Sequence, residues 1–147
     1  MLTRRLAQLD LPKARDLSNY RFSIGVKLHE ARAVAVQFGS AADGGSFYSL
    51  RYDGGSATLN FHADETSPLE PRGAISLDTS GATSGAPHEL RVERHAAAWR
   101  AYFDGRHVAT VAVLAEQDMA TIRIASEGGA AWFNSPTVAE LVADETK

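Results

Sequence analysis

At 147 residues, with 44% hydrophobic and 22% charged residues, the chain has the composition of one ordinary globular domain. A formal net charge of −3 argues against the basic surface that nucleic-acid binding needs, so no nucleic-acid partner is expected. The absence of cysteine excludes disulfides, thiolate metal sites and a cysteine nucleophile.

The N-terminal residues 1–16 contain two arginines but no apolar run of the length that a signal peptide requires. No apolar segment approaches the roughly 18 residues of a membrane span, so no membrane partner is expected and the compartment stays open. Pro12 would break a helix in this region, and we predict a first strand over residues 5–11 instead. The chain is either a whole protein or a module excised from a longer one.

Strict alternation begins at Tyr20, where the even positions through Leu28 are apolar and the odd positions are mostly polar. This period of two is typical of a half-buried strand. In the next segment, small Ala33 and Ala35 share a face with Gln37. The same test predicts strands over residues 33–39, 46–53, 57–62, 74–78, 88–94, 120–125, 131–134 and 137–142.

Turn-forming residues separate these segments. Asp-Gly-Gly-Ser occurs at 43–46 and again at 53–56, and Asp and Gly tolerate the positive φ of tight turns. The polar segments 63–73 and 78–88 are predicted as crossing loops, and residues 114–119 as at most one helical turn.

The stretch from 97 to 114 predicts a hairpin with Asp104 and Gly105 at its turn. Phe103 then opposes Arg106, and Ala101 opposes Val108. Four residues fall on an apolar core face: Trp99, Ala101, Phe103 and Val108. Three fall on the other face: Arg100, Tyr102 and His107. By the same alternation, Phe47, Val111 and Val113 are expected to point outward, where they could form a subunit interface.

Ten or eleven short strands with turns every 8–12 residues and almost no helix predict two antiparallel sheets packed face to face. We therefore expect a single all-β sandwich over residues 1–147.

Several segments carry a family resemblance: "SNYRFSIGVKL" at 18–28, "GSFYSLRYD" at 45–53, the hairpin with Tyr102-Phe103-Asp104-Gly105, and Ala131-Trp132-Phe133-Asn134 near the end. Over about residues 16–142 the chain resembles the concanavalin A-like lectin and glucanase jelly rolls. The LamG-like domains and the bacterial 3-keto-disaccharide hydrolase family are the most similar branches. The resemblance implies a jelly-roll sandwich, with binding of carbohydrate or of a protein surface, or hydrolysis of a sugar.

Catalytic patterns are missing from the sequence. The glucanase branch uses Glu-x-Asp-x-Glu on one strand face, which does not occur here, and no G-x-S-x-G nucleophile elbow occurs either. Glu89, Arg91 and Glu93 share a strand face, but the intervening arginine favours an ordinary exposed, ion-paired surface. An enzyme is therefore the less favoured interpretation.

Metal binding has weak support in the sequence. The five histidines lack the spacing of a strand or helix metal site, so no metal and no cofactor is expected. The resemblance leaves calcium open through loop acids, although each is explained more simply as a turn former. These acids are Asp43, Asp53, Asp64 and Asp78.

Carbohydrate surfaces combine an aromatic platform with planar polar groups that bind hydroxyls. Seven residues outside the predicted core are candidates for such a surface: Arg51, Asn60, His62, Arg100, Tyr102, Trp132 and Asn134. For His62, a polar position near a strand end is the simpler interpretation, and Trp132 can instead cover the core. The sequence does not tell which of these strands share a sheet.

Three hypotheses follow. The first is a non-catalytic sandwich module that binds carbohydrate or a protein surface. The second is a sugar hydrolase of the 3-keto-disaccharide hydrolase kind. The third is a structural domain that assembles into a homo-oligomer.

Overall fold

A computed structural model describes residues 4–10, 19–28, 30–41, 46–63, 70–77, 87–95, 98–113, 117–118, 121–129, 131–134 and 136–140. Within these ranges every regular element is a β-strand, which confirms the predicted all-β class. The described part of the chain contains no helix with the length and apolar character needed to cross a membrane. Three of the four loop acids, Asp43, Asp64 and Asp78, lie outside the described residues.

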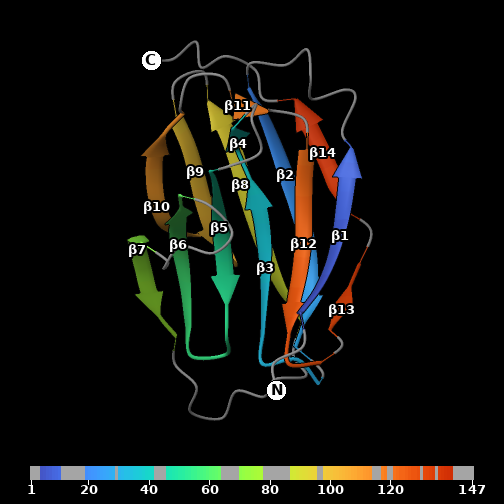
Figure 1. Ribbon diagram of the computed structural model, residues 1–147. Helices are drawn as coiled ribbons and strands as arrows, with labels where there is room; N and C mark the ends of the chain where they lie inside the picture. Colours follow the sequence, from blue (N-terminus) through green and yellow to red (C-terminus); the bar gives the residue numbers. More distant parts are fainter. Residues whose placement is uncertain are drawn as a thin grey trace.

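Two six-stranded sheets lie face to face (Figure 1). Sheet A contains, in spatial order, β1 (Arg4–Asp10), β12 (Thr121–Glu127), β3 (Ala33–Phe38), β5 (Phe47–Tyr52), β6 (Ser56–His62) and β7 (Glu70–Ser76). Sheet B contains β10 (Arg106–Ala112), β9 (Ala98–Phe103), β8 (His88–His95), β2 (Tyr20–Lys27) and β13 (Trp132–Phe133), and β14 (Thr137–Glu140) also pairs with β2. The pairings within both sheets are antiparallel, as predicted.

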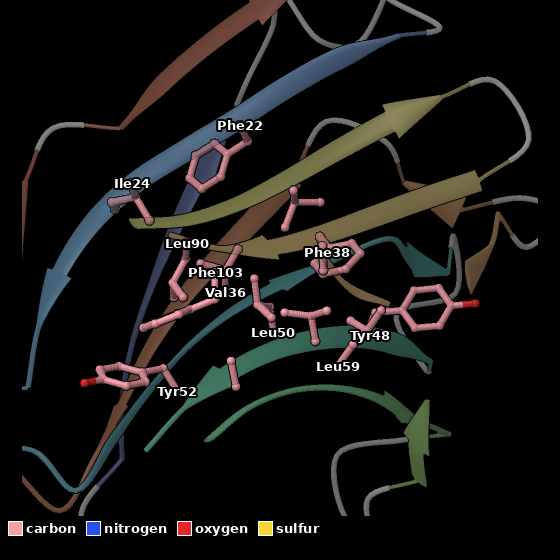
Figure 2. Close-up of a cluster of buried hydrophobic side chains, with 14 of the residues drawn as sticks. Phe22, Ile24, Val36, Phe38, Tyr48, Leu50, Tyr52, Leu59, Leu90 and Phe103 are labelled. Atoms are coloured by element: carbon pink, nitrogen blue, oxygen red, sulfur yellow. The ribbon is translucent and has the colours of Figure 1, made fainter. Parts of the chain in front are cut away.

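The core lies between the sheets, where the alternating apolar positions meet. Along β2 every even residue is buried, so the alternation from Tyr20 to Leu28 is confirmed. Aromatic rings join the two sheets: the ring centroids of Phe38 in sheet A and Trp99 in sheet B are 5.0 Å apart. Figure 2 shows this cluster, with the hydroxyls of Tyr48 and Tyr52 directed outward at its two ends. Each large side chain buried here contributes about 1.5–3 kcal/mol.

The β9–β10 hairpin turns where it was predicted to. Asp104 has φ of 49° and Gly105 has φ of 84°, the conformation for which Asp-Gly is favoured. Phe103 opposes Arg106, as expected, but Ala101 opposes Ala109 and not Val108, because a β-bulge interrupts the register after His107. The extra residue shifts the alternation of β10 by one position.

This bulge overturns the predicted outward face. Val111 opposes Trp99, and both Val111 and Val113 pack against the core. Phe47 does lie on the outer face of sheet A, but it is buried. The apolar positions that suggested a subunit interface are therefore not exposed.

Two local predictions were also wrong. Strand β7 begins at Glu70, inside the predicted loop 63–73, because Pro71 is tolerated in an edge strand such as this one. In the segment 114–119, Gln117–Asp118 forms β11, which pairs with β4 (Ser40–Ala41) in a small separate ribbon. Pairing with a distant strand overrides the weak local preference for a helical turn.

Candidate functional site

The seven candidate residues divide between the two outer faces of the sandwich. Arg51 on β5 and Asn60 and His62 on β6 lie on the outer face of sheet A. The other four belong to sheet B or to its edge: Arg100, Tyr102, Trp132 and Asn134. Because the core separates the two faces, the seven residues cannot form one surface.

The β5–β6 hairpin brings the first group together. Its turn is closed by Asp53, whose Oδ1 accepts hydrogen bonds from the backbone N–H groups of Gly55 and Ser56, each 2.9 Å long. Burial alone would raise the pKa of Asp53, but these hydrogen bonds and the charge of Arg51 outweigh it and hold the pKa below its ordinary value. Asp53 is therefore a turn former, the simpler of its two interpretations.

Polar side chains on the outer face of sheet A are unexpectedly buried. Gln37 is 6% exposed, Ser49 3%, Asn60 2% and His62 8%. The alternation predicted the outward direction of His62 correctly, but not its burial. A buried polar group needs a hydrogen-bond partner, and His62 Nε2 lies 2.7 Å from the Ser49 hydroxyl oxygen. The His62 ring also stacks on Phe47, with 4.3 Å between centroids.

Arg51 forms a forked ion pair with Glu127 on β12. Its Nε donates to one carboxylate oxygen at 3.1 Å and its Nη2 to the other at 3.2 Å, while Nη1 lies 3.4 Å from Asp53. The hydrogen bond to Glu127 raises the pKa of Arg51 despite partial burial, so the guanidinium keeps its charge. Such bidentate pairs fix the orientation of both planar groups.

These groups surround a small hollow of ≈ 30 Å³. Ala35 of β3 and Ala125 of β12 line it with small side chains, and polar groups line the rest: Gln37, Ser49, Arg51, His62 and Glu127. Asn60 opposes Ser49 on the adjacent strand and lies beside this lining. A water needs about 10–15 Å³, so the hollow can hold one or two hydroxyl-sized groups. Its lining offers them both hydrogen-bond donors and hydrogen-bond acceptors.

Gln37, Ser49 and Glu127 were not among the predicted site residues. Each looks like an ordinary outward polar residue of a strand, and Glu127 is 76 positions from Arg51. The small faces of Ala33 and Ala35 beside Gln37 were a usable signal, because small side chains leave room above a strand. The missing information was that β12, β3, β5 and β6 are neighbours.

The outer face of sheet B holds its candidates in separate contacts. The Arg91 guanidinium lies 4.4 Å from the centre of the Tyr102 ring, and His107 meets the same ring at 5.6 Å. Arg100 is exposed and lies on β9, the strand that also carries Tyr102. Trp132 is 43% exposed, so it does not cover the core, and Lys27 lies 4.9 Å from the centre of its ring.

Asn134 has a structural role. Its Oδ1 accepts a 2.7 Å hydrogen bond from the Gly25 N–H, and its own N–H donates to the Gly25 carbonyl at 3.0 Å. A Cβ at Gly25 would lie 2.5 Å from the Asn134 amide nitrogen, so a side chain at position 25 would displace the Asn134 amide from this hydrogen bond. These contacts tie the chain after β13 to β2.

Glu89, Arg91 and Glu93 share the outer face of β8, as predicted, but this face is not simply exposed. Glu93 is 7% exposed and accepts hydrogen bonds from Arg21 Nε at 3.2 Å and His95 Nε2 at 2.8 Å. Arg91 Nε lies 3.4 Å from the same carboxylate. Within the described residues, no group of three His, Asp or Glu side chains is arranged to hold a metal ion.

Comparisons with known proteins support the fold. No protein-family model matches the chain, and no curated protein sequence matches it. Among solved structures, a carbohydrate-binding module, CBM66, from Bacillus subtilis is similar with TM-score 0.61 and 12% identity, over 91% of this chain and 78% of that one. A tetrameric galectin from the ball sponge Cinachyrella sp. is similar with TM-score 0.59 and 9% identity, over 92% of this chain and 99% of that one.

A family 7 alginate lyase in complex with its substrate is also similar, with TM-score 0.56 and 10% identity, over 92% of this chain and 66% of that one. These proteins share a two-sheet β-sandwich, and at such identities the likeness concerns the fold. Because a galectin, a carbohydrate-binding module and a lyase share this architecture, the fold alone does not identify the function, which must be argued from the site. The chain thus has the β-sandwich fold found in galectins and carbohydrate-binding modules.

Proposed function

We propose that the protein is a non-catalytic carbohydrate-binding module whose ligand lies on the outer face of sheet A. One observation carries the proposal: polar side chains from four strands converge on a hollow with small alanines in its lining. Outward polar residues of an ordinary strand are solvated, whereas Gln37, Ser49 and His62 are held almost buried on this face. Order of this kind is typical of a prepared binding site.

The chemistry of the hollow suits saccharide hydroxyls. A hydroxyl both donates and accepts a hydrogen bond, and the charged Arg51–Glu127 fork offers a rigid donor beside a rigid acceptor. At ≈ 30 Å³ the hollow takes one hydroxyl or hydroxymethyl group and not a whole ring. The proposed ligand therefore lies across the face and inserts one substituent. The similarity of the fold to a carbohydrate-binding module and to a galectin supports this ligand class.

Glycan-array screening followed by calorimetry tests the proposal. Arg51→Ala is expected to weaken binding of any glycan hit at least about tenfold, because charge-assisted hydrogen bonds are among the strongest polar contacts. Arg51→Lys is expected to weaken it too, since an ammonium cannot form the planar fork. Thermal melts of each variant separate loss of binding from loss of fold.

The double variant Arg100→Ala/Tyr102→Ala is the matched control, because it removes an arginine and an aromatic residue from the opposite face. It is expected to bind like the unmodified protein. Loss of binding in this variant alone would move the site to sheet B. A broad saccharide panel without any hit would overturn the proposed function.

A LamG-like or 3-keto-disaccharide hydrolase-like subtype remains a prediction from the sequence, and so do a protein ligand and a homo-oligomer. Turnover of a 3-keto-glycoside by the purified chain would place the protein with the hydrolases. Sedimentation of the chain as a monomer would count against assembly.

A further inference from the structure

A larger cavity lies at one end of the sandwich, away from the hollow on sheet A. It is formed where β5 ends, where β8 begins and where the β9–β10 hairpin turns. Its volume is ≈ 200 Å³. Its lining includes Tyr52, His88, Phe103 and Asp104.

Asp104 holds His88 in a fixed orientation. Its Oδ2 lies 2.7 Å from His88 Nδ1, and its Oδ1 accepts the Glu89 N–H at 2.8 Å. The Asp104 N–H in turn donates to the Glu89 carbonyl at 2.9 Å. An ionised carboxylate only accepts, so His88 Nδ1 donates its proton to Asp104, and Nε2 is the ring nitrogen that Asp104 does not engage.

Aromatic rings from both sheets build the walls. His88 meets Tyr52 at 5.1 Å and Phe103 at 5.0 Å between ring centroids, and Tyr52 lies 4.7 Å from Phe103. Figure 2 shows the Tyr52 hydroxyl directed away from the core. Burial, followed by the negative charges of Asp104 and Asp53, raises the pKa of Tyr52, so its hydroxyl stays protonated at neutral pH and can donate.

We propose that this cavity binds one monosaccharide unit, as a second carbohydrate site of the module; the ligand class rests on the proposed function. A cavity of about 150 Å³ holds one benzene, so ≈ 200 Å³ fits one six-membered ring with its substituents. A sugar ring presents C–H groups that suit an aromatic lining, and His88, with its side chain 21% exposed, offers the main surface, because Tyr52 and Phe103 are 4% and 3% exposed. Its hydroxyls satisfy His88 Nε2 and the Tyr52 hydroxyl, whereas a plain phenyl ring leaves both unpaired.

Amide chemical-shift mapping with methyl glycosides of glucose, galactose and mannose tests the proposal. At least one glycoside is expected to shift the amides around residues 88–89 and 103–106, which belong to sheet B, separately from any shifts around Arg51 and Glu127 of sheet A. His88→Ala is expected to weaken this binding about tenfold or more, as loss of one ligand hydrogen bond and a ring contact predicts. Tyr52→Phe keeps the ring and removes only the hydroxyl, so a smaller loss is expected.

Trp132→Phe is the control, because Trp132 is exposed and lines neither the hollow nor the cavity, and it is expected to leave binding at the cavity unchanged. His88→Gln keeps a polar group at the position and guards against misfolding of the alanine variant. If glycosides shift only the outer face of sheet A, or if His88 variants that fold bind normally, the cavity proposal fails while the proposed function stands. Phenol binding in the cavity without any glycoside binding would also overturn it. The glycan array decides the proposed function separately. Hits that are lost in Arg51→Ala support that function, and a panel without any hit overturns it.

Discussion

Glu93 is a nearly buried carboxylate on the outer face of β8 whose neighbours favour its ionised form. It receives hydrogen bonds from His95 and Arg21. Burial alone would raise its pKa, but the hydrogen bonds from His95 and Arg21 and the charge of Arg91 outweigh this and lower the pKa below the ordinary 4.5. A group whose pKa is lowered on folding stabilises the native state above its unfolded pKa, and this contribution is lost as the pH falls through the folded pKa.

We therefore predict that Glu93→Gln lowers the free energy of unfolding by about 1–3 kcal/mol at pH 7, because it removes a buried charge from its cationic partners. The difference from the unmodified protein is expected to shrink below about pH 4.5, where the carboxylate of the unfolded chain begins to protonate, and to be lost as the pH falls through the lower pKa of the native state. Urea denaturation at a series of pH values measures both effects.

Glu89→Gln is the control for this prediction. Glu89 lies on the same strand face with its side chain 45% exposed and 4.0 Å from Arg91, so a change within about 0.5 kcal/mol is expected. Equal losses in the two variants, or a Glu93 effect that does not depend on pH, would show that ionisation of Glu93 is not what stabilises this face.

The candidate residues were predictable one at a time but not as a set. Arg51, Asn60 and His62 meet because a local turn folds β5 onto β6, and that turn is visible in the sequence as Asp-Gly-Gly-Ser. Glu127 reaches Arg51 only through the pairing of β12 with β3 and β3 with β5. Non-local pairing depends on how whole faces bury, which a single strand does not encode.

At the scale of elements, the strands were predictable where alternation was strict, and less so at irregularities. β2 has its predicted burial pattern because nothing interrupts its period of two. In β10 one extra residue after His107 turns Val111 inward, and no residue type in that strand announces the bulge. In β7 the edge position makes Pro71 acceptable, and being at an edge is itself a property of the folded sheet.

The edges of the two sheets meet closely at Gly73. A Cβ at this position of β7 would lie 2.6 Å from the Ala109 Cβ and 3.0 Å from the Val108 carbonyl oxygen. Both contacts belong to the bulged part of β10 in the opposite sheet. The approach of β7 to β10 thus closes one side of the sandwich and leaves no room for a side chain.

Gly73→Ala is accordingly predicted to destabilise the protein by about 1–3 kcal/mol, the cost of overpacking a filled site. Gly55→Ala is the matched control, because a Cβ there meets only Asp53 Oδ1 at an ordinary 3.8 Å. That change should be neutral, or stabilising by up to about 1 kcal/mol through the unfolded chain. Thermal unfolding of both variants compares the same substitution with and without the contact. Equal melting temperatures would mean that β7 and β10 separate without cost.

At the scale of the whole molecule, contacts between the sheets make one core. Phe38 packs on Trp99, Tyr52 on Phe103, and the Tyr48 hydroxyl donates to the Ala112 carbonyl at 2.8 Å, each across the two sheets. Neither sheet can bury its apolar face without the other, so the sheets are expected to unfold together. That the chain is a single domain is a prediction from the sequence, and cooperative unfolding of the two sheets provides a test of it.

The two tryptophans of the chain provide that test, because Trp99 is 1% exposed and Trp132 is 43% exposed. Trp132→Phe removes the exposed indole at little cost to stability, so the fluorescence of the variant reports the core alone. We predict emission typical of a buried indole that shifts to longer wavelength in denaturant. Its midpoint should coincide with loss of the far-ultraviolet β signal, as two-state unfolding of one domain requires. Transitions at separate denaturant concentrations would mean that part of the chain unfolds independently of the core around Trp99, and the prediction of a single domain would then be wrong.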